Sequence, residues 1–276
     1  MAKGPWDLLI CLRCDKNLSL IADTVDSVLA FTDRRTTKVM CAVDGNPRLV
    51  SQLANVVPGA IYATPRRHGW GAGLYGLLAE SIAWSKVRWK YNHFLSIDYD
   101  TLFVGSKGDK IDELLLNQIT NPRVGLLGQY NPQNVHWAAV YKAERARIIA
   151  VFGQPPKKYI PGEGIQGGCM LLTATLIEQM LKRGMLAFPF ADAKRVTSIA
   201  DDHLITLFCR MCGLKIEQLS PEFHVRWKLD CDPRTLQKKG VKVFHPTKIR
   251  PNNTDSRVEL DVRNFFRDQR GRPPLR

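Results

Sequence analysis

The sequence predicts an α/β fold in which helices cover both faces of a mixed, mostly parallel central sheet in a single domain. Three observations support this prediction. Short apolar runs alternate with longer amphipathic segments in the first third of the chain, which is typical of parallel strands joined by helices. Hydrophobic residues make up 45% and charged residues 24% of the 276 residues, so the chain can bury a large core. No apolar stretch approaches the roughly 18 residues of a membrane-spanning helix.

The first half of the chain is regular. Apolar runs between turn residues predict strands at 7–12, 38–43, 60–63 and 93–97. Apolar residues at helical spacing predict helices at 18–31, 48–57 and 73–87. In sheets built this way, ligands bind beyond the carboxyl ends of the strands. A functional site is therefore expected at that edge.

The second half is less regular. The same patterns predict helices at 110–119, 175–183 and 201–212, and strands at 124–127, 167–172, 214–219 and 241–244. The residues from Asn252 onward are charged and end in a Pro-rich stretch. They predict a basic C-terminal tail, residues 251–276, that is mobile or ordered by a partner.

The chain is strongly basic, because 40 Lys and Arg residues against 26 Asp and Glu residues give a net charge of +14. Such a surplus attracts polyanions. Aromatic residues are interleaved with the basic ones at 88–91 and 226–228, a mixture that suits phosphate contact combined with stacking. Nucleic acid, an anionic membrane surface and a phosphorylated substrate all remain open as partners at this point.

Seven cysteines are present, and two pairs have the Cys-x-x-Cys spacing of a zinc site, Cys11 with Cys14 and Cys209 with Cys212. Both pairs lie within apolar patterns, so the stronger interpretation is that they are core thiols. The N-terminal residues lack the apolar segment of a secretory signal. The expected location is the reducing cytoplasm, that of the host if the protein is viral.

The strongest chemical signal is residues 94–100, FLSIDYD, in which an apolar strand runs into two aspartates separated by one residue. Strand side chains alternate between faces, so Asp98 and Asp100 are expected to project the same way. Two converging carboxylates repel one another unless a cation lies between them. Hard oxygen ligands suit Mg²⁺ or Mn²⁺. The alternative is a polar turn with two surface aspartates.

Further polar residues follow other predicted elements. Asp44 ends the second strand, and the glycine-rich residues 69–73 open a helix, as a close approach to phosphate or ribose requires. The acidic pair Asp201 and Asp202 opens a later helix, where an N-cap is the alternative interpretation. His245 and Lys248 follow a late strand, and a structural histidine is the alternative there. Residues 160–169 are rich in glycine, which allows close backbone approach, but a flexible connection is equally compatible.

In order, these elements resemble the GT-A glycosyltransferases: a strand-helix series, an Asp-x-Asp motif, an acidic pair before a Gly-Leu-Lys-Ile segment, and then His-Pro-x-Lys. The acidic pair is similar to the Glu-Asp motif of the inverting family 2-type enzymes. Asp201 stands where that family usually has Glu, and the glycine-rich segment lacks the usual Arg-Asn pairing. The resemblance covers roughly residues 7 to 250.

The resemblance implies a hexosyltransferase that uses a nucleoside-diphosphate sugar, most commonly a uridine diphosphate sugar, and a divalent cation, Mn²⁺ or Mg²⁺. Residues 1–250 would form one Rossmann-like GT-A domain, with a nucleotide-binding half at 1–105 and an acceptor and catalytic half at 106–250. The implied site residues fall into four groups. Asp100 and His245 would bind the metal; Asp15, Asp44, Arg66, Gly71, Asp98 and Lys248 the donor; Glu163, Gln166 and Asp201 the acceptor or sugar; and Asp202 would be the general base of an inverting reaction.

The acceptor is not defined by these residues. The basic charge suits an acceptor hydroxyl on nucleic acid, for example on a modified base in DNA that is presented out of the stack, and the lack of an apolar anchor or amphipathic basic helix favours it. The first alternative is a lipid-linked or polysaccharide acceptor at an anionic membrane. The others are a nucleotidyltransferase, which also places metal-binding carboxylates at strand ends, and a nucleic-acid-binding module without activity.

Overall fold

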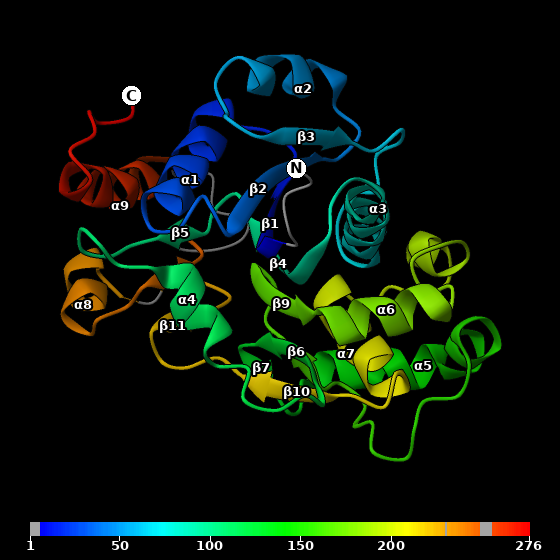
Figure 1. The fold of residues 1–276 in the computed structure, drawn as a ribbon. Coiled ribbons are helices and arrows are strands. Elements are labelled where there is room, and N and C mark those ends of the chain that lie inside the picture. Colours follow the sequence, from blue (N-terminus) through cyan, green and yellow to red (C-terminus); the bar gives the residue numbers. More distant parts are fainter. Residues whose placement is uncertain (1–5, 230, 249–255) are drawn as a thin grey trace.

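A seven-stranded sheet forms the centre of the molecule in the computed structural model, which describes residues 6–229, 231–248 and 256–276 (Figure 1). The strand order is β10-β6-β9-β4-β1-β2-β3. The strands are β1 (Trp6–Cys14), β2 (Thr37–Val43), β3 (Ala60–Ala63), β4 (Tyr91–Asp98), β6 (Val124–Gly128), β9 (Cys169–Thr173) and β10 (Lys215–Gln218). Only β9 runs antiparallel to its neighbours, β4 and β6. The prediction of a mixed, mostly parallel sheet is confirmed.

Helices cover both faces of this sheet, which explains why its strands read as continuous apolar runs. Along β1, Leu8 and Ile10 pack on one face, and Leu9 and Cys11 pack on the other. The first face is covered by α1 (Leu18–Ala30), α2 (Pro47–Ala54) and α4 (Ile111–Leu116). The second is covered by α3 (Ala72–Arg88), α5 (Val135–Phe152), α6 (Ala174–Lys182), α7 (Asp201–Met211) and the 3-10 helix η1 (Phe190–Arg195).

The carboxyl ends of the parallel strands meet at one edge. The register of β1 pairs Cys14 with Val43 of β2 and Arg13 with Asp98 of β4. Because β9 is antiparallel, it brings its amino end to the same edge, where Cys169 pairs with Ile97. The residues that follow β1, β2 and β4, and those that precede β9, are therefore neighbours in space.

Two smaller sheets are also present in the described part of the chain. One has the order β11-β12-β5 and is built from β11 (Phe223–Val225), β12 (Val243–His245) and β5 (Leu102–Phe103). The other pairs β7 (Tyr130–Asn131) with β8 (Gly164–Ile165). In the first, β12 is antiparallel to β5 and pairs Phe244 with Leu102. This register brings His245, the last residue of β12, beside the segment that follows β4.

Three α-helices within the described residues were not predicted from the sequence: α5 (Val135–Phe152), α8 (Pro233–Lys238) and α9 (Ser256–Gln269). The expected mobile tail is wrong for residues 256–276, because α9 is ordered and lies beside α1 (Figure 1). Its apolar side chains Val262 and Phe266 are buried. Residues 251–255 of that expected tail lie outside the described residues.

The cysteine pairs are part of the core. Cys11, Cys14, Cys209 and Cys212 are buried and carry free thiols, as the core interpretation predicts. Within the described ranges, no cysteine belongs to a cluster that could hold a metal ion. None of the helices in those ranges is long and apolar enough to cross a bilayer.

Candidate functional site

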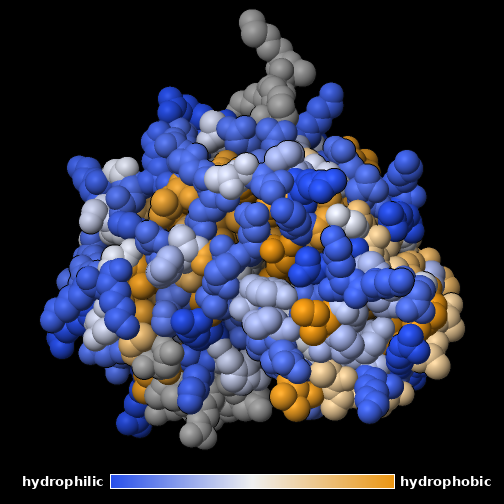
Figure 2. All heavy atoms as spheres, turned by 90° about the horizontal axis from the view of Figure 1, so that it is seen from below, coloured by the Kyte–Doolittle hydropathy of each residue, from blue (hydrophilic) through white to orange (hydrophobic). Residues whose placement is uncertain are grey.

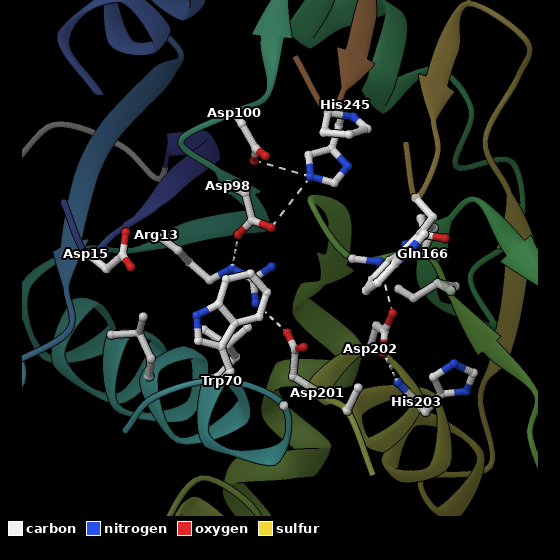
Figure 3. A pocket seen from close by; sticks show the side chains of 18 of the residues that line it. Arg13, Asp15, Trp70, Asp98, Asp100, Gln166, Asp201, Asp202, His203 and His245 are labelled. Carbon is white, nitrogen blue, oxygen red and sulfur yellow. Dashed lines mark hydrogen bonds and ion pairs between the residues drawn. The ribbon is translucent and has the colours of Figure 1, made fainter. Parts of the chain in front are cut away.

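A cavity of about 710 Å³ opens at the carboxyl edge of the sheet, where the predicted site residues gather (Figure 3). The elements that surround it are the strand ends of β1, β2 and β4, the amino ends of α3, α5 and α7, and the segment after β12. The predicted residues that line it are Asp15, Asp44, Gly71, Asp98, Asp100, Gln166, Asp201, Asp202, His245 and Lys248.

Asp98, Asp100 and His245 converge in this cavity. One ligand atom from each can be chosen so that all three atoms lie within 4.8 Å of one another. The His245 Nε2 atom is 3.3 Å from Asp100 Oδ1 and 3.7 Å from Asp98 Oδ2. This is the only such cluster in the part of the chain that the structure describes. Two aspartates separated by one residue therefore converge with a histidine from a strand 145 residues later along the chain (245 − 100).

The chemistry of this group fits a divalent cation. Burial lowers the pKa of His245, but the carboxylates of Asp100 and Asp98 outweigh burial, so the net shift is upward. The pocket thus favours positive charge at the point where the three side chains meet. Two carboxylate oxygens and one imidazole nitrogen suit Mn²⁺ or Mg²⁺, with Mn²⁺ more tolerant of the nitrogen.

Gly168 allows the histidine ring to approach this closely. Its φ of +89° is unfavourable for residues with a Cβ, and a Cβ there would lie 2.5 Å from the His245 ring. The Gly168 carbonyl accepts hydrogen bonds from the Asp98 backbone N–H, at 3.2 Å, and the Thr101 hydroxyl, at 2.7 Å. The residue before β9 therefore braces the Asp-x-Asp turn and makes room for the His245 ring.

Lys248 adds a positive charge beside the group. Its Nζ atom lies 2.9 Å from Asp100 Oδ2 and 3.3 Å from the Tyr99 hydroxyl. Burial lowers the pKa of Lys248, but the Asp100 carboxylate more than reverses the effect. Burial raises the pKa of Asp100, yet His245 and Lys248 together bring it below its ordinary value. Asp100 is therefore held as a carboxylate.

Arg13 links the Asp-x-Asp turn to helix α7. Its guanidinium is buried, lies 2.8 Å from Asp98 Oδ1, and donates a hydrogen bond to Asp201 (Figure 3). Arg13 was not among the predicted site residues, although a charged residue inside the apolar run of β1 is a signal that could have identified it. A buried cation between two carboxylates offsets their repulsion.

Asp201 and Asp202 occupy the first turn of α7, and both are buried. Burial raises the pKa of Asp201 to about 6; Arg13 opposes the increase, while Asp202 and Asp98 add to it. Burial also raises the pKa of Asp202 to about 6, against hydrogen bonds from the backbone N–H groups of Gly167 and His203. Such values fit groups that exchange protons near neutrality.

A second part of the cavity is formed by the ends of β1 and β2. The Asp44 carboxylate accepts hydrogen bonds from the backbone N–H groups of His68, at 2.7 Å, and Gly69, at 2.9 Å. Gly71 caps α3 with a φ of +62°. Burial raises the pKa of Asp15, whose Oδ1 atom is buried and has no hydrogen-bond partner among the described residues. Its carboxyl group can therefore accept a hydrogen bond from a ligand in the cavity.

Two predicted site residues lie elsewhere. Arg66 does not line the cavity, and its guanidinium pairs at 3.4 Å with Asp192 of η1; the next residue, Arg67, lines the cavity instead. Glu163 is fully buried and is bound to Arg210 and to the Tyr130 hydroxyl. Because its carboxylate is satisfied inside the protein and does not reach the cavity, the prediction of acceptor contact for Glu163 is wrong.

Aromatic side chains form part of the cavity wall. Trp70 and Trp227 are 67% and 62% exposed, and the Trp137 ring packs at a tilt of 42° against the His203 ring, with 5.5 Å between the ring centroids. Trp137 and His136 come from the first turn of α5. The sequence predicted no element there, because the apolar residues of this helix do not follow one face. Gln166 lines the same region, beside β8.

No family model and no curated protein matches the sequence. Among solved structures, the galactosyltransferase LgtC, in complex with donor and acceptor sugar analogs, is similar with a TM-score of 0.50 at 13% identity, over 95% of each chain. The bifunctional glycosyltransferase WbbM is similar with a TM-score of 0.52 at 12% identity, over 96% of this chain and 51% of WbbM. This chain therefore spans about half the length of WbbM.

A third similar structure is the mannosyltransferase PcManGT from Pyrobaculum calidifontis, in complex with GDP-Man and Mn²⁺. It has a TM-score of 0.47 at 17% identity, over 79% of this chain and 59% of PcManGT. The match to LgtC spans nearly the whole of both chains. The chain therefore has the GT-A glycosyltransferase fold, as the sequence predicted.

The Arg13→Met substitution tests the central ion pairs. It leaves Asp98 and Asp201 without their buried cation, so we expect a loss of about 3–5 kcal/mol in the free energy of unfolding at neutral pH. Without Arg13 the pKa of folded Asp201 rises further above its unfolded value. The folded state then takes up a proton as the pH falls, and the loss should shrink by about pH 5.

Urea unfolding at both pH values measures this effect. Arg35→Met is the matched control, because Arg35 forms an exposed pair with Asp33, and surface pairs contribute about 1 kcal/mol or less. If Arg13→Met lowers the free energy of unfolding equally at both pH values, or no more than the control does, Arg13 is not the buried cation that offsets the charges of Asp98 and Asp201.

Proposed function

We propose that the protein is a metal-dependent glycosyltransferase that moves a sugar from a nucleoside-diphosphate sugar to an acceptor hydroxyl. The observation that carries the proposal is the convergence of Asp98, Asp100 and His245 in the cavity at the carboxyl edge of the sheet. The fold shared with LgtC, which was solved with donor and acceptor sugar analogs, supports the same class of reaction.

The chain's own residues can supply the donor contacts. Lys248 lies beside Asp100, where its charge can stabilise a departing diphosphate. Asp15 and Asp44 follow neighbouring strands and offer carboxylates for the ribose or base. A bound Mn²⁺ or Mg²⁺ would neutralise charge that develops on the diphosphate. We take uridine diphosphate sugars as the first donors to test, on the resemblance described above.

We propose a single displacement that inverts the anomeric carbon. The acceptor oxygen forms a bond to that carbon as the bond from carbon to diphosphate oxygen breaks, and the acceptor proton passes to Asp202. Two observations support Asp202 as the general base. It lines the cavity with a pKa of about 6, and Figure 3 shows it in a different part of the cavity from Asp100. Arg13 pairs with the preceding residue, Asp201, which leaves Asp202 without a direct ion pair among the described residues.

The acceptor that we propose is nucleic acid, with a hydroxylated base as one form. The net charge of +14 and the exposed rings of Trp70 and Trp227 at the cavity support it, because aromatic platforms beside basic residues hold unstacked bases. The face seen in Figure 2 is covered mainly by hydrophilic side chains, with smaller hydrophobic groups between them. Six cysteines, Cys11, Cys14, Cys41, Cys169, Cys209 and Cys212, are buried thiols outside any disulfide, which suits a reducing compartment, so we propose the cytoplasm as the location.

The cation ligands are tested by Asp100→Ala. We expect transfer or hydrolysis of nucleoside-diphosphate sugars with Mn²⁺ to fall by about a hundredfold or more, because the cation supplies several kcal/mol of charge stabilisation. Glu113→Ala, which removes an exposed carboxylate outside the cavity, should leave the rate unchanged. Turnover of nucleoside triphosphates instead of nucleotide sugars would identify a nucleotidyltransferase. No Mn²⁺-dependent turnover of either class would point to a binding module.

The role of Asp202 is tested by Asp202→Asn and by pH. Asp202 accepts a proton only when ionised, so we expect the wild-type kcat to fall about tenfold per pH unit below its pKa of about 6. The variant should lose about 10² to 10⁴-fold in kcat with the donor KM little changed, and its acidic limb should disappear. The product anomer, read by NMR, should be inverted. Retention of configuration would overturn the role of Asp202 as a base.

The acceptor class is tested by binding to duplex DNA, followed by fluorescence anisotropy. We expect affinity that falls steeply between about 50 and 200 mM salt, since displaced counterions drive such binding. Vesicles with anionic lipids serve as the comparison. Absence of DNA binding at low salt, with binding to the vesicles, would replace the nucleic-acid acceptor with one at a membrane surface.

A further inference from the structure

The C-terminal helix α9 reaches both of the loops that carry the cation ligands. The first loop runs through Tyr99, the residue between Asp98 and Asp100. The second runs from His245 to Lys248 and includes Thr247. The two loops are joined directly, because the Thr247 backbone N–H donates to the Asp100 carbonyl at 2.9 Å.

Arg263 of α9 holds the first loop. Its side chain is fully buried, and its NH2 group donates to the Tyr99 carbonyl at 2.7 Å. The same carbonyl accepts a hydrogen bond of 2.6 Å from the Thr24 hydroxyl of α1. The NH1 group of Arg263 pairs with Asp23 of α1 at 2.9 Å. The backbone between the two aspartates is therefore fixed from two helices.

Glu259, one turn earlier on α9, holds the second loop. Its Oε1 atom accepts a hydrogen bond of 2.6 Å from the Thr247 hydroxyl, and Thr247 is fully buried. The same oxygen accepts from Arg263 at 3.2 Å. One pair of charged side chains, Glu259 and Arg263, thus connects the two loops through a shared ion pair.

The charge around this pair is balanced by α1. Asp23 is buried and is bound by Arg263, Arg267 and Arg270 of α9. This arrangement anchors the helix independently of the loops. If Arg263 alone is removed, Asp23 keeps its ion pairs with two arginines. Glu259 keeps its hydrogen bond from Thr247, and the Tyr99 carbonyl keeps its hydrogen bond from Thr24. No buried charge would then lose all of its partners.

We propose that α9 is a working part of the cation site, with Glu259, Arg263 and Thr247 as positioning residues that set the spacing of Asp98, Asp100 and His245. The inference rests on the proposed function, because it assumes that these three side chains bind a divalent cation. Groups that orient metal ligands without touching the metal commonly change metal affinity by about 10- to 100-fold when they are removed.

The test is a titration of the full chain with Mn²⁺ alone, followed by electron paramagnetic resonance. Thr247→Val removes one hydroxyl and keeps the shape, and we expect Mn²⁺ to bind about tenfold more weakly. Thr247→Ser keeps the hydroxyl and should restore the affinity to within about twofold of wild type. A role in stability alone would lower the thermal midpoint in chelator without this difference in Mn²⁺ affinity.

A second pair of variants separates the loop contact from the anchor. Arg263→Met and Arg267→Met each remove one arginine from Asp23, but Arg267 has no contact with either loop among its described hydrogen bonds. Only Arg263→Met should weaken Mn²⁺ binding. Equal affinity in wild type, Thr247→Val and Arg263→Met would overturn the inference and leave the proposed function standing. Absence of Mn²⁺ binding by the wild type would overturn both.

Discussion

The gathering of carboxylates at one edge of the sheet is the constraint on which the rest of the site depends. Asp98, Asp100, Asp201 and Asp202 all line one cavity, and like charges in a partly buried site are costly unless cations separate them. Two positively charged side chains offset part of this repulsion: Arg13 lies between Asp98 and Asp201, and Lys248 lies against Asp100. The remaining negative charge meets at His245, where a divalent cation fits.

Much of the fold and of this edge could be predicted from local sequence. The strand-helix alternation of the first half follows from apolar periodicity, and the carboxyl ends of parallel strands must share an edge, which is why Asp44 and Asp98 were expected together. The structure also brings His245 to Asp100 and Asp202 to the cavity. Their roles as ligand and base remain proposals.

Other features of the fold and the site depend on side-chain contacts between residues that lie far apart in the sequence, so the local sequence pattern does not indicate them. The sequence of α9 resembles a charged, solvent-exposed tail. In the structure, however, Arg263 faces inward and binds Asp23, which lies 240 residues earlier in the chain. Glu163 reads as a polar loop residue, yet its partner Arg210 lies on α7 and satisfies it inside the protein. Arg66 and Arg67 are adjacent, and only the local backbone decides that the second faces the cavity. Periodicity describes neighbours along the chain, so it misses such pairings.

Anomalous diffraction from crystals grown with Mn²⁺ and a nucleoside diphosphate tests the central claim most directly. The account predicts one strong manganese peak within coordination distance of Asp98 or Asp100 and His245, with the diphosphate on its open side. Arg13 should still pair with Asp201. A peak located instead at Asp201 and Asp202, or no peak in this cavity while the nucleotide is bound, would contradict the assignment of these side chains as the cation site.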